Sequence, residues 1–193
     1  MLSNLKKYNV ILASKSPRRQ ELLKGMGVDF TVMTKETAED FDASMPSDMV
    51  PEFLSLQKSA AFKDVDLPAN YLVVTSDTVV IAEGEILGKP KDRDDALRML
   101  RLLSGKTHRV VTGVTVRSAE KTVTFSVKSD VTFATLESDE MAYYVDVCRP
   151  YDKAGAYGIQ EWIGYIGISG LNGSFYNVMG LPTHRLYQVL KTF

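Results

Sequence analysis

A short segment near the start of the chain combines hydroxyl and guanidinium side chains at the point where a strand gives way to a helix. These residues are Ser14, Ser16, Arg18 and Arg19, and they follow the predicted strand 9–13, of which residues 10–13 are apolar. Hydroxyls, guanidinium groups and the free N–H groups of a helix start all bind phosphate oxygens. The spacing of these residues is equally consistent with a phosphate site and with a capped helix that carries two solvated arginines.

A single carboxylate interrupts one of the most β-prone stretches of the chain. Asp77 lies within residues 71–82, which are otherwise rich in β-branched side chains. Because burial of an unpaired charge is costly, Asp77 must be paired, bind a metal or lie at a sheet edge that faces a cleft. The alternative is a carboxylate at a bulge or strand end. Lys89 follows a short β excursion and could return its ammonium to the same cleft, although alone it would be a solvated turn lysine.

Three further polar residues have weaker individual cases. Glu39 lies in an acidic loop and Lys58 on a predicted helix, and both kinds of position are usually solvated. The segment 154–160 includes small residues that allow close backbone approach to a ligand, and the amide of Gln160 could read a base edge with its donor and acceptor together. Packing against another element explains this last segment equally well.

Several common catalytic motifs are absent. The glycines between residues 155 and 173 form neither a phosphate-binding loop ending in Lys-Ser or Lys-Thr nor a dinucleotide fingerprint after a strand, so kinase, P-loop and Rossmann functions are unsupported. His108 and His184 lack the spaced partners of a metal site or a catalytic triad, and we assign both a structural role.

The elements that must position these residues alternate between strands and helices. Strands are predicted at residues 9–13, 28–33, 71–76 with 78–82, 109–117, 122–128 and 130–135. Helices are predicted at about residues 17–24, 48–62, 92–104, 138–147 and from 182, with Ser16 and Asp92 as N-caps. Residues 34–47 are predicted as a loop, and Asn172-Gly173 as a hairpin turn. This order predicts an α/β fold with a mixed sheet.

The composition bounds the function classes. The 193 residues suit one domain, and a net charge of −1 offers no general attraction to nucleic acid or to an anionic membrane. The lone Cys148 cannot form an internal disulfide and is expected to be a buried structural thiol in a reducing compartment. The apolar run 10–13 is too short for a signal peptide, and no apolar run is long enough to span a membrane. We therefore expect a cytoplasmic protein.

Six motifs, in order along nearly the whole chain, carry a resemblance to a known family. They are LASKSPRR at 12–19, SDTVV at 76–80, GKP at 88–90, LSGKTH at 103–108, DKAGAYGIQ at 152–160 and GLP at 180–182. Together they resemble the Maf nucleotide pyrophosphatases, and the segment 152–160 resembles the dTTP and UTP pyrophosphatase branch.

The resemblance implies a fold and a reaction. The fold is a Maf or ITPase-like α/β domain spanning residues 1–193, with a mixed twisted sheet, flanking helices and two lobes around a central cleft. The reaction is metal-dependent hydrolysis of nucleoside triphosphates to the monophosphate and pyrophosphate, which would clean the nucleotide pool. The implied substrates are dTTP and UTP, with modified pyrimidine triphosphates as further candidates. Members are often homodimers, so a homodimer is also implied.

The resemblance also implies roles for individual residues. Asp77 matches the catalytic acidic residue, and Mg²⁺ or Mn²⁺ would be held by Asp77 and Glu39. The substrate-binding or specificity positions are Ser14, Arg18, Arg19, Lys58, Thr78, Lys89 and Gln160. The chain departs from the family pattern at Ser55, Ser59, Ser76 and Glu161. Among these, Glu161 replaces a frequent glycine and places an extra negative charge beside Gln160.

Two other functions are weighed against the enzyme. The first is a nucleotide-binding regulator of cell division with slow or incidental hydrolysis, but binding alone would not require a carboxylate next to a polyphosphate. The second is a nucleic-acid binder that uses Arg18 and Arg19, which the neutral charge balance and the lack of a basic face disfavour. The expected partner is therefore a nucleoside triphosphate, with no nucleic acid and no membrane.

Overall fold

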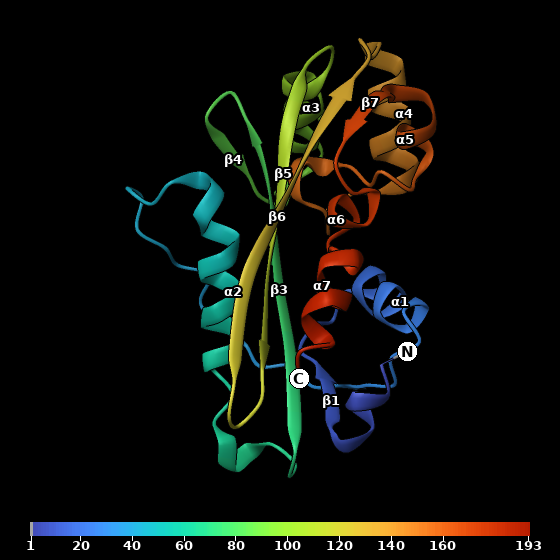
Figure 1. Ribbon diagram of the computed structural model, residues 1–193. Helices are drawn as coiled ribbons and strands as arrows, with labels where there is room; N and C mark the ends of the chain where they lie inside the picture. Colours follow the sequence, from blue (N-terminus) through green and yellow to red (C-terminus); the bar gives the residue numbers. More distant parts are fainter. Residues whose placement is uncertain (1) are drawn as a thin grey trace. The chain divides into compact units, whose positions relative to one another are not determined.

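A computed structural model describes residues 2–193 (Figure 1). Its strands are β1 (Asn9–Leu12), β2 (Thr31–Val32), β3 (Tyr71–Ala82), β4 (Glu85–Leu87), β5 (Thr107–Arg117), β6 (Thr122–Phe133) and β7 (Ile168–Asn172). Within the described residues they form one sheet in the order β2-β1-β3-β5-β6-β7, with β4 paired to β3. Because β1 pairs with β2 and β3 in parallel while β4 and β7 pair in antiparallel fashion, the sheet is mixed, as predicted.

Among the described residues, five helices lie where the sequence predicted them, and two short ones, at residues 162–167 and 175–179, were not predicted. The helices are α1 (Pro17–Gly25), α2 (Val50–Ala60), α3 (Arg93–Leu103), α4 (Ser138–Cys148), α5 (Trp162–Gly167), α6 (Phe175–Met179) and α7 (Thr183–Leu190), with short 3₁₀ turns at Ser3–Lys7, Ser47–Met49, Asp64–Asp66 and Ala154–Ala156. Asp92 caps α3 by accepting a hydrogen bond from the N–H of Asp95 at 2.9 Å. Across residues 2–193, no helix combines the length and the apolar character needed to cross a membrane.

The sequence predicted breaks in two strands, and both predictions are wrong. The polar residues that suggested these breaks are paired with residues of other elements. β3 runs unbroken through Asp77, and β6 runs unbroken through residues 128–130. In β6, Asp130 accepts a hydrogen bond from Arg109 Nε at 2.8 Å, and the buried Ser129 hydroxyl accepts one from Asn177 Nδ2 at 3.0 Å. A charged or hydroxyl side chain with a hydrogen-bond partner of this kind does not interrupt the pairing of strands in the sheet.

Two other predictions need correction. The strand predicted at 28–33 shrinks to Thr31–Val32, the two residues that pair with β1. Asn172-Gly173 does not join two strands of a hairpin, because β7 ends at Asn172 and leads into α6. Gly173 has a φ of 131°, and a side chain there would meet the backbone and side chain of Ser129. The Asn-Gly signal therefore marks a strand-to-helix turn packed closely on β6.

The chain divides into two compact units, in keeping with the expected two lobes. Unit 1 comprises residues 1–77, 112–127 and 180–193, and unit 2 comprises 78–111 and 128–179. β3, β5 and β6 each contribute residues to both units. In unit 1, an apolar cluster of Ile11, Phe62, Tyr71 and Val73 lies beneath the loop residue Met33.

Unit 2 has an apolar core of its own. Its buried residues come from β3 to β6, from α3 and α4, and from the segment 156–163. α3 packs against α4 and against the 3₁₀ turn Ala154–Ala156. Cys148, predicted to be buried, is half-buried at the end of α4; its thiol is free, and burial raises its pKa. A protonated thiol of this kind suits a structural role.

Candidate functional site

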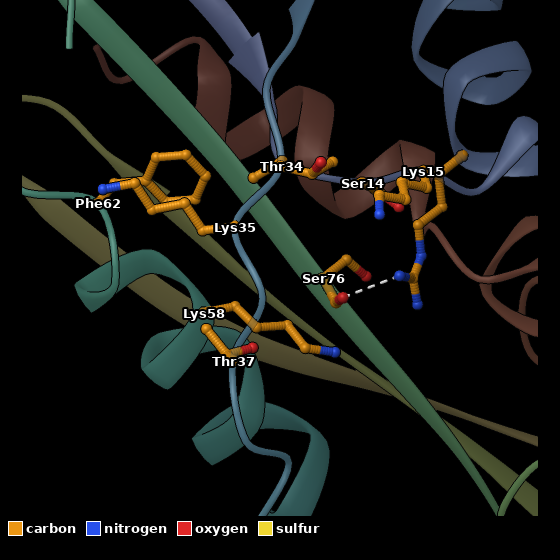
Figure 2. A pocket seen from close by; sticks show the side chains of 10 residues that line it. Ser14, Lys15, Thr34, Lys35, Thr37, Lys58, Phe62 and Ser76 are labelled. Atoms are coloured by element: carbon orange, nitrogen blue, oxygen red, sulfur yellow. Dashed lines mark hydrogen bonds between the residues drawn. The ribbon is translucent and has the colours of Figure 1, made fainter. Parts of the chain in front are cut away.

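A pocket of about 200 Å³ in unit 1 is lined mainly by cationic and hydroxyl side chains (Figure 2). The cations are Lys15, Arg19, Lys35 and Lys58, and the hydroxyls are Ser14, Thr34, Thr37 and Ser76; Ala13 and Phe62 complete the lining. Ammonium, guanidinium and hydroxyl groups are hydrogen-bond donors without a competing carboxylate in this lining. The pocket is therefore suited to an anion with several oxygens.

The start of α1 forms one side of this pocket through a local capping arrangement. Ser16 caps the helix by accepting a hydrogen bond from the N–H of Arg19, and Pro17 occupies the first helical position. The N–H of Ser16 in turn donates to Ser14 Oγ at 3.2 Å, and Ser14 is buried. The sequence prediction of a strand, a cap and a helix at this point is confirmed, and it places the hydroxyl of Ser14 at the pocket.

Arg19 is held by two backbone carbonyl groups rather than being solvated. Its Nε donates to Gly180 O and its Nη1 to Ser76 O, both at 2.9 Å. Burial lowers the pKa of Arg19, while the negative charge of Asp77 opposes that shift and the positive charge of Arg18 adds to it. An arginine keeps its charge in proteins. The interpretation of Arg19 as a merely solvated arginine is therefore wrong, although Arg19 is partly exposed, as is Arg18 on the same helix.

Lys58 brings two carboxylates together beside the pocket. Its Nζ lies 2.5 Å from Asp77 Oδ1 and 2.7 Å from Glu39 Oε1. The side chain of Asp77 is only 11% exposed and that of Lys58 16%, whereas that of Glu39 is 57% exposed. Of the possibilities that the cost of burial left open, Asp77 is thus paired, and it lies inside a continuous strand rather than at a bulge or strand end.

Close packing of α2 on the sheet fixes where Lys58 can reach. Thr75 Oγ1 donates to Ser55 O at 2.6 Å, and Ser55 Oγ lies 3.0 Å from Thr115 Oγ1. A Cβ built on Gly113 would lie 2.1 Å from the carbonyl oxygen of Pro51, so only glycine permits this approach of β5 to α2. These buried contacts hold the helix against β3, and Lys58 extends from it to Asp77.

The other predicted substrate residues belong to unit 2. Thr78 follows Asp77 directly in β3 and is partly buried, and Lys89 is exposed in the turn after β4. The N–H of Gly155 donates to Gly88 O at 3.0 Å, which ties the segment that carries Gln160 to the turn that carries Lys89. Gln160 Oε1 is buried and has no hydrogen-bond partner within residues 2–193.

The pocket includes cations that the sequence analysis did not select. Lys35 contacts Asp66 at 2.6 Å and lies over the ring of Phe62, and Lys15 is exposed beside Ser14. Lys35 lies in the stretch 34–47, which its acidic composition led us to treat as a solvated loop. Nothing in the sequence distinguishes a lysine of such a loop that lines a pocket from one that is solvated. Lys15 lies inside the LASKSPRR motif and could have been selected there.

The carboxylates at this site are oxygen donors for a hard cation. Within residues 2–193, no three His, Cys, Asp or Glu side chains gather as a metal site, so Asp77 and Glu39 form a pair rather than a complete cage. Mg²⁺ is commonly bound by one or two carboxylates together with substrate phosphates and water. The donor set therefore fits Mg²⁺ or Mn²⁺ that arrives with a polyphosphate.

Comparison with known proteins gives consistent relatives. Residues 9–193 match the family described as Maf-like protein. The chain is 53% identical to a dTTP/UTP pyrophosphatase of Porphyromonas gingivalis, over 100% of this chain and 98% of that protein. It is 50% identical to a protein of the same name from Bacteroides thetaiotaomicron, over 99% of both chains. A solved structure, the Ham1 protein of Staphylococcus aureus, aligns with a TM-score of 0.44 and 18% identity, over 65% of this chain and 72% of that one.

Proposed function

Because this chain belongs to the Maf family, we propose that it hydrolyses dTTP and UTP to the monophosphate and pyrophosphate. It is then a nucleoside triphosphate pyrophosphatase, a hydrolase that acts on a phosphoric anhydride bond. The observation that carries the proposal is the meeting of Asp77, Glu39 and Lys58 beside a pocket of cations and hydroxyls. Neither a purely structural protein nor a simple anion binder needs a buried carboxylate there.

The residues of unit 1 suit the chemistry of water attack on the α-phosphorus. Attack by water on that atom forms a new P–O bond and breaks the bond to the oxygen that bridges to the β-phosphorus, so pyrophosphate leaves. Arg18, Arg19 and Lys58 would neutralise the polyanion so that water can approach. Asp77 would accept the proton of the attacking water or orient that water through a bound cation. Ser14 would donate a hydrogen bond to a phosphate oxygen.

A divalent cation fits the same carboxylates. We propose that Asp77 and Glu39 hold Mg²⁺ or Mn²⁺, since their oxygens already converge on one positive charge, the ammonium of Lys58. When bound, such an ion neutralises phosphate oxygens and acidifies water.

Selection of the base is proposed for Gln160 and Thr78. Uracil and thymine present an N3–H donor between two carbonyl acceptors, whereas cytosine presents an N3 acceptor beside an amino donor. The buried, unpartnered Oε1 of Gln160 is an acceptor that the N3–H could satisfy, and its Nε2 could donate to a carbonyl. A site that leaves this acceptor unpaired with cytosine would reject CTP.

Pyrophosphate release tests the proposal directly. The panel comprises canonical and modified nucleoside triphosphates, assayed with Mg²⁺ and then with a chelator. We expect metal-dependent release led by dTTP and UTP, lowered by about two to three decades in Asp77→Asn, because a key acid/base or electrostatic group is lost. Asp146→Asn, which removes an exposed carboxylate paired with Arg93, is the matched control. Tight nucleotide binding without release would instead support the regulator.

We also propose a setting for the enzyme: a homodimer in the cytoplasm that binds no nucleic acid. A single cysteine suits the cytoplasm, a nearly neutral chain suits a small substrate rather than nucleic acid, and the family resemblance suits a homodimer. That residues 1–193 act as a single domain likewise stays a prediction. Sedimentation analysis of the purified chain would measure the oligomeric state.

A further inference from the structure

Glu161, the residue after Gln160, is held by two donors inside unit 2. Lys153 Nζ lies 3.0 Å from its Oε1, and the hydroxyl of Tyr144 donates to its Oε2. The Glu161 side chain is 24% exposed and that of Lys153 only 8%. The extra negative charge noted in the sequence is therefore compensated, and it belongs to a buried network rather than to the solvent.

The network fastens the whole segment from Lys153 to Glu161. The ion pair joins its two ends, and the N–H of Gly158 donates to the same Tyr144 hydroxyl at 3.0 Å. Tyr144 is fully buried on α4 between the core residues Met141 and Val145, and burial raises the pKa of its hydroxyl, which keeps that group a donor to Glu161. The anchor is thus a core side chain of a regular helix.

Gln160 lies between two of the fastened residues. A Cβ built on Gly158 would lie 2.9 Å from Glu161 Cδ and 3.1 Å from Gln160 Nε2, so both side chains pack on this glycine. Displacement of the Glu161 carboxylate would therefore free the space in which the Gln160 amide rests. Within the described residues the buried Oε1 acceptor of Gln160 has no hydrogen-bond partner that could replace this support.

We propose that Glu161 is a positioning residue for base selection: through Lys153, Tyr144 and Gly158 it fixes the amide of Gln160 in the orientation that reads uracil and thymine. This inference rests on the proposed function and adds to it a residue that does not itself touch the substrate. Loss of the Glu161 carboxylate would leave the buried ammonium of Lys153 with Asp152 as its remaining carboxylate partner, a residue whose side chain is 57% exposed, whereas that of Glu161 is 24% exposed.

The test compares selectivity, not activity alone. For the wild type, Glu161→Ala, Tyr144→Phe, Gln160→Ala and the double variant Glu161→Ala with Gln160→Ala, kcat/KM is measured for dTTP and for CTP. We expect Glu161→Ala and Tyr144→Phe to lower the dTTP/CTP ratio by about tenfold, the equivalent of one misplaced hydrogen bond. In the Gln160→Ala background, removal of Glu161 should leave the ratio unchanged, because Glu161 acts through that amide.

Several results separate this inference from its alternatives. The control Asp146→Asn removes an exposed carboxylate from α4, the helix that carries Tyr144, and should keep the wild-type dTTP/CTP ratio. A merely structural role would lower the melting temperature of Glu161→Ala and Tyr144→Phe while leaving the dTTP/CTP ratio at the wild-type value, and that result would overturn the inference. Should Glu161→Ala not fold, Tyr144→Phe, which loses one oxygen atom, carries the test. A wild type that releases no pyrophosphate from dTTP or UTP would refute the proposed function itself.

Discussion

The ammonium of Lys58 lies between two carboxylates, in the position that a metal cation held by them would occupy. It contacts Asp77 and Glu39 at 2.5 and 2.7 Å, and both it and Asp77 are largely buried. A buried carboxylate that loses its partner is strongly destabilised. The same geometry means that a divalent cation held by Asp77 and Glu39 would have to share these oxygens with Lys58.

Lys58→Met tests this competition. Without the ammonium, Asp77 and Glu39 should bind Mg²⁺ more tightly by about tenfold, the equivalent of about 1.4 kcal/mol. The reason is that no lysine charge then neutralises the two carboxylates. Turnover of dTTP should fall by about two decades, since a cation that stabilises the polyphosphate is lost. Mg²⁺ affinity is measured by calorimetry and turnover by pyrophosphate release.

An exposed lysine provides the matched control for that variant. Lys63→Met removes the same charge at a solvated position just after α2 and should change neither quantity appreciably. If Lys58→Met binds Mg²⁺ no more tightly than the wild type does, Asp77 and Glu39 are not the metal ligands.

At the scale of elements, α2 and β5 approach each other at a glycine. Gly113 lies where a Cβ would be 2.1 Å from Pro51 O and 2.4 Å from the N of Glu52, both of which are backbone atoms of α2 that cannot rotate away. The hydrogen bonds from Thr75 to Ser55 and between Ser55 and Thr115 lie in the same contact. The position of Lys58 therefore depends on this approach.

Gly113→Ala should destabilise the protein by about 3 kcal/mol, because an added methyl group must push α2 away from the sheet. It should also lower dTTP turnover through the displacement of Lys58, although residue 113 lines no part of the pocket. Chemical denaturation and pyrophosphate release measure the two effects.

Gly25→Ala is the control at this scale. It lies at the end of α1 with no atom within 4 Å of the added Cβ, and its stability should change by less than about 1 kcal/mol. Equal effects of the two substitutions would show that the contact between α2 and β5 does not limit stability.

At the scale of the whole molecule, one buried histidine links stability to pH. His108 is 3% exposed, its Nε2 lies 2.7 Å from the Tyr157 hydroxyl, and its Nδ1 has no hydrogen-bond partner within the described residues. Burial lowers its pKa from 6.5 to about 4, although the charge of Asp130 opposes the shift. Between those two pH values the unfolded chain binds more protons than the folded one, so acidification favours unfolding.

We therefore expect His108 to account for a loss of about 3 kcal/mol of unfolding free energy as the pH falls from 6.5 to 4. His108→Gln removes the titrating group and keeps a partner for the Tyr157 hydroxyl, so its stability should fall less over this range. Urea denaturation at several pH values measures the difference. His184→Gln, at the exposed histidine on α7, should follow the wild-type profile. Parallel profiles for wild type and His108→Gln would contradict the expectation.

Local patterns determined most of the elements and the family. The cap at Ser16 and Pro17, the cap at Asp92, the period of the helices and the β-prone runs depend on residues close in sequence, so they could be predicted. The cost of a buried charge also limited Asp77, from the sequence alone, to a paired, metal-bound or cleft-edge position, and the ordered motifs identified the Maf family.

Tertiary structure decided which partners those residues have. Several contacts of the two units join residues from separate elements. They are the meeting of Asp77 and Glu39 at Lys58, the backbone carbonyl partners of Arg19, the cations Lys35 and Lys15 at the pocket, and the contacts of Glu161 with Lys153 and Tyr144. The unbroken course of β6 through Asp130 has the same origin, since Arg109 lies on another strand. A sequence lists charges in order along the chain, but their energies depend on distances and burial that only packing sets.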